Sequence, residues 1–163
     1  MTRILLVEDD KSLGATLKER LEKEGYLVHW SENLALAKKE IEGQSFDLYV
    51  LDIGLPDGEG FELIANLDRR PFIFLTAQSD AETRLKGYDL GAEEFIPKPF
   101  HLRELLLRIR HVLDNHSPLK IVELGEFKVN FDSLICEKSG YSDPLTTKDV
   151  LLLKRLIEHR PKL

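Results

Sequence analysis

The chain has 163 residues, of which 42% are hydrophobic and 32% are charged, and its formal net charge is −6. This composition is typical of a soluble globular protein, and no apolar run approaches the ~20 residues of a membrane span, so we expect no membrane partner. The single cysteine excludes an internal disulfide. Acidic residues soon after the N-terminus argue against a signal peptide, so we expect a cytoplasmic protein.

Charge is unevenly distributed along the chain. Residues 1–115 carry 15 basic and 22 acidic side chains, whereas residues 116–163 carry 8 basic and 7 acidic side chains. An acidic first part does not favour nucleic-acid binding, and the remainder is not basic enough to bind nucleic acid by charge alone. The length fits one full domain and a part of a second.

Short β-type runs alternate with helical patterns through residues 1–115. The runs are mostly continuous in hydrophobicity, which is typical of parallel strands covered on both faces. We predict strands over Ile4–Val7, Tyr26–Trp30, Asp47–Leu51, Phe72–Leu75 and Glu94–Ile96. Five amphipathic stretches complete five β-then-α units, including Lys11 to Glu24 before Gly25, a stretch from Ser79 or Asp80 to Gly91, and a last one from Leu102 to Leu113. This alternation predicts a doubly wound α/β domain with right-handed crossovers.

A second, smaller region follows a predicted linker at residues 116–120, where Ser117 and Pro118 are typical of a loop. We predict β-type runs over 121–124, 127–131 and 134–138, with turns over 130–133 and 139–144. Thr146 and Asp149 have the spacing of a capping box and predict a helix start. Its apolar stripe contains Val150, Leu152, Leu153, Leu156 and Ile157.

Polar side chains follow four of the five predicted parallel strands. Ligands of doubly wound sheets bind at the carboxyl ends of the strands, so these side chains should share one edge. They are Glu8, Asp9 and Asp10 after the first strand, Asp52 after the third, Thr76 after the fourth and Lys98 after the fifth. Each one alone could be a helix cap, a turn residue or a solvated side chain. Their joint placement at successive strand ends favours a functional site.

The charges of these side chains indicate the chemistry. Two carboxylates about 5 Å apart repel by roughly 3 kcal/mol at an effective dielectric constant of about 20. Lys98 offsets part of this repulsion, and Mg²⁺, which prefers carboxylate oxygens and retains water, can offset the rest. Asp52 beside Mg²⁺, Lys98 and the hydroxyl of Thr76 is a nucleophile able to accept a phosphoryl group.

Four motifs resemble the receiver domain of two-component response regulators: VEDD (7–10), VLDIGLPDGEG (50–60), FLTA (74–77) and GAEEFIPKPF (91–100). The resemblance implies a flavodoxin-like fold with strand order 2-1-3-4-5, in a domain that covers residues 1–115. It implies that a sensor histidine kinase phosphorylates Asp52 and that Thr76 and Lys98 contact the phosphoryl group. The implied Mg²⁺ ligands are Glu8, Asp9, Asp52 and the backbone carbonyl of Gly54. A cis peptide bond between Lys98 and Pro99 is also expected.

The same resemblance assigns an output surface. Phe95 occupies the aromatic switch position and would rotate as Thr76 moves toward the phosphate. The expected homodimer interface of OmpR/PhoB-type receivers would use the pairs Arg84–Glu104, Asp89–Arg110 and Glu94–Arg108. A two-fold interface needs such self-complementary charges, although an ordinary solvated face remains the alternative.

Residues 121–163 resemble the start of the winged-helix effector domain of the same OmpR/PhoB family. The resemblance ends before the recognition helix and the wing, so DNA binding and transcription regulation are expected only through the missing part, in the intact parent protein. Two alternatives stay open: a receiver that acts as a protein-docking module, and an Asp-nucleophile phosphohydrolase. Such hydrolases usually carry a second acid two residues after the nucleophile, where this chain has Gly54. We therefore expect a phosphoacceptor with slow self-dephosphorylation and not an enzyme.

Overall fold

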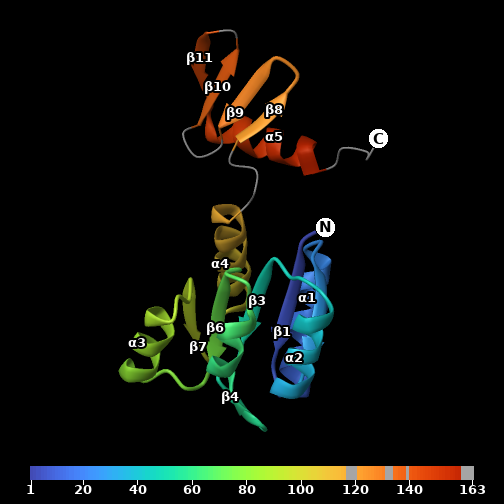
Figure 1. Ribbon diagram of the computed structural model, residues 1–163, viewed down its shortest axis with the longest axis vertical. Helices are drawn as coiled ribbons and strands as arrows, with labels where there is room; N and C mark the ends of the chain where they lie inside the picture. The colour runs from blue at the N-terminus through green and yellow to red at the C-terminus, as the bar shows by residue number, and fades with distance from the viewer. Residues whose placement is uncertain (117–120, 131–133, 139, 159–163) are drawn as a thin grey trace. The chain divides into compact units, whose positions relative to one another are not determined.

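A five-stranded parallel sheet forms the centre of the first part of the chain (Figure 1). The computed structural model describes residues 1–116, 121–130, 134–138 and 140–158. The strands are β1 (Arg3–Val7), β2 (Leu27–Ser31), β3 (Leu48–Leu51), β6 (Phe72–Thr76) and β7 (Glu94–Pro97), in the order β2-β1-β3-β6-β7. This is the predicted order, and every neighbouring pair is parallel. The prediction of a doubly wound receiver-like sheet is confirmed.

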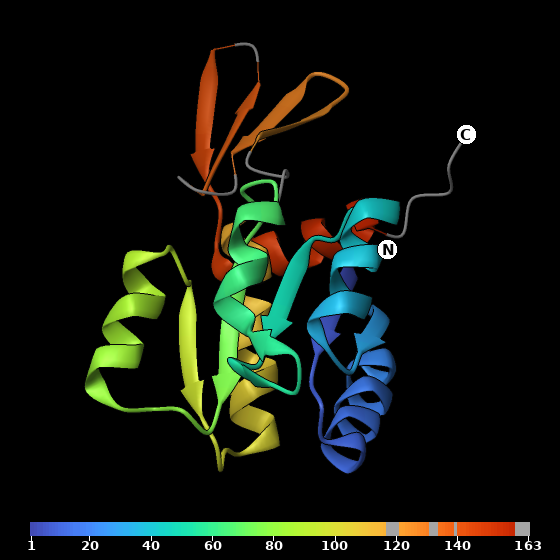
Figure 2. The same cartoon turned by 60° about the horizontal axis from the view of Figure 1, so that its bottom comes forward.

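Helices cover both faces of this sheet (Figure 2). They are α1 (Lys11–Lys23), α2 (Leu34–Gly43), α3 (Ala81–Asp89), α4 (Leu102–Asn115) and the 3₁₀ helix η1 (Gly60–Asn66). The third β-then-α unit therefore contains a 3₁₀ helix instead of an α-helix. Between β3 and η1, the two-residue strands β4 (Gly54–Leu55) and β5 (Gly58–Glu59) pair antiparallel.

Two apolar layers hold the sheet between the helices. On one face, alternate strand residues such as Ile4 and Leu6 pack with α1 and α4 residues, including Leu17 and Ile109. On the other face, the remaining strand residues pack with α2, with η1 and with Ala92, just after α3. Because both faces are covered, the strands need apolar residues at consecutive positions, which explains their continuous hydrophobicity.

The chain divides into two compact units, Met1–His116 and Ser117–Leu163. In the second unit, four antiparallel strands follow the order β11-β10-β9-β8. They are β8 (Ile121–Leu124), β9 (Phe127–Asn130), β10 (Ile135–Lys138) and β11 (Tyr141–Pro144), and they precede helix α5 (Thr147–Glu158). The predicted linker residues 117–120 and the predicted turn residues 131–133 and 139 lie outside the described residues.

The predicted turn over 139–144 is wrong for its last four residues, which form strand β11. Gly140 has a positive φ of 89°, which allows a tight connection between β10 and β11. Tyr141 therefore already pairs with Lys138, and Pro144 pairs with Ile135. Ser, Asp and Pro are typical loop residues, but an edge strand tolerates them because one side of its backbone needs no partner strand.

The capping box of α5 is present as predicted. The Thr146 Oγ1 accepts a hydrogen bond from the Asp149 backbone N–H at 3.2 Å, and the Thr146 N–H donates to Asp149 Oδ2 at 2.8 Å. Val150 and Val129 form the buried centre of this unit. Leu152 and Leu156, which we placed on the apolar stripe of this helix, are exposed.

Candidate functional site

The predicted strand-end residues lie at the carboxyl edge of the parallel sheet. Glu8 and Asp9 follow β1 directly, and Asp52 follows β3. Each of these three residues offers a carboxylate oxygen, and the three oxygens lie within 4.8 Å of one another. Glu8 and Asp52 are buried, with 1% and 6% of their surface exposed, whereas Asp9 is exposed. The topology therefore concentrates three acids that are up to 44 positions apart in the sequence.

Lys98 joins two of these acids. Its Nζ donates to Glu8 Oε2 at 2.6 Å and to Asp52 Oδ2 at 2.8 Å. The lysine follows β7, and its peptide bond to Pro99 is cis, as expected. The Lys98 backbone N–H also donates to the Thr76 carbonyl at 2.9 Å, which ties the chain after β7 to the end of β6.

The pKa values of Glu8 and Lys98 are both raised, but the physical causes differ. Burial raises the pKa of Glu8 above its ordinary value, although hydrogen bonds from Lys98 and from the Asp10 N–H oppose this shift. Burial alone would lower the pKa of Lys98, but hydrogen bonds and charge from Asp52 and Glu8 outweigh burial and raise it. Lys98 is therefore a firmly charged cation at this edge of the sheet.

The donor set fits a divalent cation with a preference for oxygen ligands. Three carboxylates exceed the single charge of Lys98, so the cluster keeps an excess of negative charge. Asp9 is exposed and can approach an ion from the solvent side. Gly54 is folded back toward the cluster, because its N–H donates to Asp52 Oδ1 at 3.2 Å. Carboxylate and carbonyl oxygens of this kind are typical ligands of Mg²⁺.

Thr76 and Phe95 lie on the neighbouring strands β6 and β7. Thr76 is fully buried, and its Oγ1 accepts a hydrogen bond from the Gln78 backbone N–H at 3.1 Å. The ring of Phe95 is 6% exposed and packs 5.9 Å from the Phe74 ring and 6.3 Å from the Tyr88 ring, measured between centroids. The aromatic side chain therefore points into the protein in this structure.

The charged residues of the expected dimer surface lie on α3, β7 and α4. Arg84 and Asp89 are exposed on α3. Arg108 pairs within the chain with Glu94 at 2.6 Å and with Glu104 at 2.9 Å.

Arg110 also has an intrachain partner, since its Nη2 lies 3.6 Å from a Glu24 carboxylate oxygen. Intermolecular pairs that use Arg108 or Arg110 would therefore have to compete with contacts inside one chain.

Sequence reasoning missed several residues that shape the site. An added Cβ at Gly60 would lie 2.0 Å from the Asp52 carbonyl oxygen, so η1 can approach the acid only with glycine at this position. An added Cβ at Gly54 would lie 2.8 Å from Gln78 Nε2, which places this amide beside the cluster. Asp57 accepts hydrogen bonds from the first backbone N–H groups of α2 and anchors the loop after Asp52. These contacts join distant segments and have no local sequence signal.

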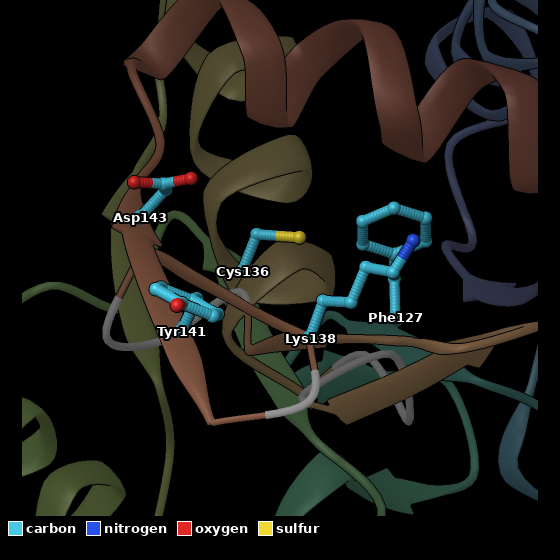
Figure 3. Close-up of a pocket in the computed structure, with 5 residues that line it drawn as sticks. All are labelled: Phe127, Cys136, Lys138, Tyr141 and Asp143. Atoms are coloured by element: carbon cyan, nitrogen blue, oxygen red, sulfur yellow. The ribbon is translucent and has the colours of Figure 1, made fainter.

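A separate pocket of about 310 Å³ lies on the sheet of the second unit (Figure 3). Its lining contains Phe127, Cys136, Lys138, Tyr141 and Asp143. All five are cross-strand neighbours on β9, β10 and β11, and Lys138 Nζ lies 4.8 Å from the Phe127 ring centroid. None of these residues belongs to the acidic cluster, so this pocket is separate from the candidate site. Among the described residues, no helix is long and apolar enough to cross a membrane.

Comparison with known proteins agrees with the fold. Residues 4–110 match the response regulator receiver domain family. The transcriptional activator protein IrlR of Burkholderia pseudomallei (strain 1026b) is 31% identical over 156 residues, which cover 93% of this chain and 68% of IrlR.

Two solved receiver domains have similar folds. The non-phosphorylated HemR receiver domain from Leptospira biflexa is 52% identical, with a TM-score of 0.66 and coverage of 69% of this chain and 94% of HemR. The beryllofluoride-activated NtrC4 receiver domain dimer is 35% identical, with a TM-score of 0.67 and coverage of 72% of this chain and all of that chain.

The parallel sheet with acids at its carboxyl edge defines the class of this protein as a receiver-fold signalling protein. The chain belongs to the response regulator receiver domain family of two-component systems.

Proposed function

We propose that the chain is a phosphoacceptor response regulator and that Asp52 receives a phosphoryl group from the phosphohistidine of a sensor histidine kinase. A carboxylate oxygen of Asp52 forms a bond to phosphorus as the bond between phosphorus and the histidine nitrogen breaks, and the released imidazole takes up a proton. Mg²⁺, held by Glu8, Asp9, Asp52 and the Gly54 carbonyl, would supply charge neutralisation for the phosphoryl oxygens. Lys98 and the hydroxyl of Thr76 bind phosphoryl oxygens in this proposal.

The observation that carries this proposal is the position of Asp52 between a cation and two further acids. Its Oδ2 lies 2.8 Å from Lys98 Nζ, and it shares a cluster with Glu8 and Asp9 in which ligand oxygens are within 4.8 Å. This arrangement holds the Asp52 carboxylate in a defined orientation beside sites for a metal and for anionic oxygens.

The absence of a side chain at Gly54 favours a phosphoacceptor over a phosphohydrolase. Such a hydrolase usually carries a second acid two residues after the nucleophile, where it activates water or protonates the leaving group. The side chain nearest to this position is the uncharged amide of Gln78. Slow self-dephosphorylation by water is therefore the expected fate of the acyl phosphate.

We further propose that phosphorylation shifts Thr76 and the ring of Phe95 and so changes the surface of α3, β7 and α4. The beryllofluoride-activated NtrC4 receiver domain is a dimer, and a dimer of this chain through Arg84, Asp89, Glu94, Glu104, Arg108 and Arg110 is the corresponding proposal. Since Arg108 already binds Glu94 and Glu104 within the chain, dimerisation would exchange these contacts for equivalent ones between chains.

We assign residues 1–115 to a receiver domain, 116–120 to a linker and 121–163 to a part of a winged-helix effector domain of the OmpR/PhoB type. The second unit supports this assignment, because a four-stranded antiparallel sheet precedes a capped helix. IrlR, of which the chain covers 68%, is a transcriptional activator. We therefore propose transcription regulation through DNA binding, in the cytoplasm, as the output of the intact protein.

Phosphorylation of Asp52 is tested by incubating the chain with acetyl phosphate and Mg²⁺ and measuring its intact mass. The wild type should gain one phosphoryl group, and Asp52→Asn should gain none. Asp68→Asn is a matched control, because this exposed acid lies after η1 and outside the acidic cluster.

Three results would contradict the proposal. They are an adduct on Asp52→Asn, no adduct on the wild type, or rapid turnover of acetyl phosphate without an adduct. The last result would favour the hydrolase.

A further inference from the structure

Glu8 is held at its backbone as well as at its carboxylate. Its N–H donates to the Ser31 carbonyl at 3.0 Å, and its carbonyl accepts a hydrogen bond from Trp30 Nε1 at 2.8 Å. Both partners lie at the end of β2, the strand next to β1. The Glu8 carbonyl belongs to the peptide bond that joins Glu8 to Asp9. Its orientation therefore affects the positions of two of the three clustered acids.

Gly14 makes room for the indole ring that provides this hydrogen bond. An added Cβ at Gly14 would lie 2.2 Å from Trp30 Cζ2 and 2.6 Å from Nε1. Gly14 lies in the first turn of α1, where its N–H donates to the Asp10 carbonyl at 2.8 Å. The ring is thus in contact with the helix that begins immediately after the acidic pair, and only glycine permits this close packing.

We propose that Trp30 is a positioning residue for the cation-binding acids and that Gly14 is required for its placement. This inference rests on the proposed function, because it assigns to Trp30 a role in divalent-cation binding by Glu8 and Asp9. The indole N–H fixes the Glu8–Asp9 peptide plane before the ion arrives. Without this hydrogen bond, the peptide plane would have to be ordered when the cation binds. The cation affinity would then be weaker, although every ligand of the cation would still be present.

The Mg²⁺ dissociation constant of Trp30→Phe tests this role. Phenylalanine keeps an aromatic ring but removes the N–H donor. Since one hydrogen bond contributes a factor of about three to ten in an equilibrium constant, we expect the dissociation constant to rise about threefold to tenfold. The measurement is an NMR titration of the full chain with MgCl₂, followed through the Gly54 amide. With acetyl phosphate, the Mg²⁺ concentration for half-maximal rate should rise by the same factor, while the rate at saturating Mg²⁺ stays close to that of the wild type.

Gly14→Ala is the second variant, because it displaces the indole and leaves the donor in the chain. In the chain that keeps Trp30, Gly14→Ala should weaken Mg²⁺ binding about as much as Trp30→Phe does. Combined with Trp30→Phe it should add little to the loss of Mg²⁺ affinity, since the hydrogen bond is already absent. This non-additivity would not follow from a general loss of packing.

Tyr49→Phe is the control for a structural effect, because it changes a buried aromatic residue on β3 away from the cluster. It should leave Mg²⁺ affinity unchanged. The inference is overturned if Trp30→Phe binds Mg²⁺ like the wild type, or if Trp30→Phe and Tyr49→Phe weaken binding equally. If the wild type itself binds no Mg²⁺, the proposed cation site fails, and the role of Trp30 fails with it.

Discussion

Replacing Lys98 by methionine removes the cation that joins two buried acids. Lys98 Nζ lies 2.6 Å from Glu8 Oε2 and 2.8 Å from Asp52 Oδ2, so these two oxygens are at most about 5.4 Å apart. At an effective dielectric constant of about 20, two negative charges at this separation repel by roughly 3 kcal/mol. Removing one member of a buried ion pair typically costs about 3–5 kcal/mol. We therefore expect Lys98→Met to lose about 3 kcal/mol of unfolding free energy at neutral pH without Mg²⁺.

This loss should depend on pH, because Glu8 can become neutral. Burial already raises the pKa of Glu8, and hydrogen bonding and charge from Lys98 oppose that shift, so the variant should have a still higher Glu8 pKa. A carboxyl group whose pKa is raised by folding binds its proton more tightly in the folded state. The stability that the protonated carboxyl group contributes is then present at low pH. It is lost as the pH rises above the ordinary pKa of 4.5 and through the pKa of the folded state. The variant should approach the wild type near pH 4.5.

Urea unfolding followed by Trp30 fluorescence measures this effect in the first unit, because Trp30 is the single tryptophan of the chain. Lys23→Met is the matched control. Lys23 makes an exposed pair with Glu19 on α1, and such pairs contribute only about 0.2–1 kcal/mol. Added Mg²⁺ should restore stability to Lys98→Met more than to the control. Equal losses for the two variants, or a loss in Lys98→Met that stays constant from neutral pH to about pH 4.5, would refute the reasoning.

Two further substitutions test the burial of Glu8 and the packing at Phe95. Because burial raises the Glu8 pKa, Glu8→Gln should gain unfolding free energy relative to the wild type as the pH rises above 4.5. Urea titrations without Mg²⁺ measure this difference. A difference that does not change with pH would contradict the prediction. An added Cβ at Gly87 would lie 3.1 Å from the Phe95 ring and 3.2 Å from Phe74, so Gly87→Ala should lose about 1 kcal/mol, although alanine normally favours a helix. Gly43→Ala is the control, because no atom lies within 4 Å of the added Cβ, and it should be neutral or stabilising. A gain in unfolding free energy for both variants would exclude tight packing at Phe95.

The sequence predicted most of the first unit because its signals are local. Continuous apolar runs located all five parallel strands to within about one residue, and Gly25 and Gly91 lie just beyond the ends of α1 and α3. Turn signals failed at β11, where Ser142, Asp143 and Pro144 have loop propensity but pair with β10. The propensity of a residue reflects its own type and its local sequence, whereas a strand also depends on pairing with a partner strand.

The sequence also determined which residues gather at the candidate site, because parallel strands bring their carboxyl ends to one edge. Glu8, Asp52 and Lys98 follow three such strands, and from their types we predicted a phosphoacceptor site. Only the tertiary structure decided the partners. It brought Lys98 to both acids, placed the indole of Trp30 against Gly14, and paired Arg108 with acids of its own chain. The reason is physical: strand periodicity is encoded within a few neighbouring residues, whereas a hydrogen bond or an ion pair depends on which distant segments the fold packs together.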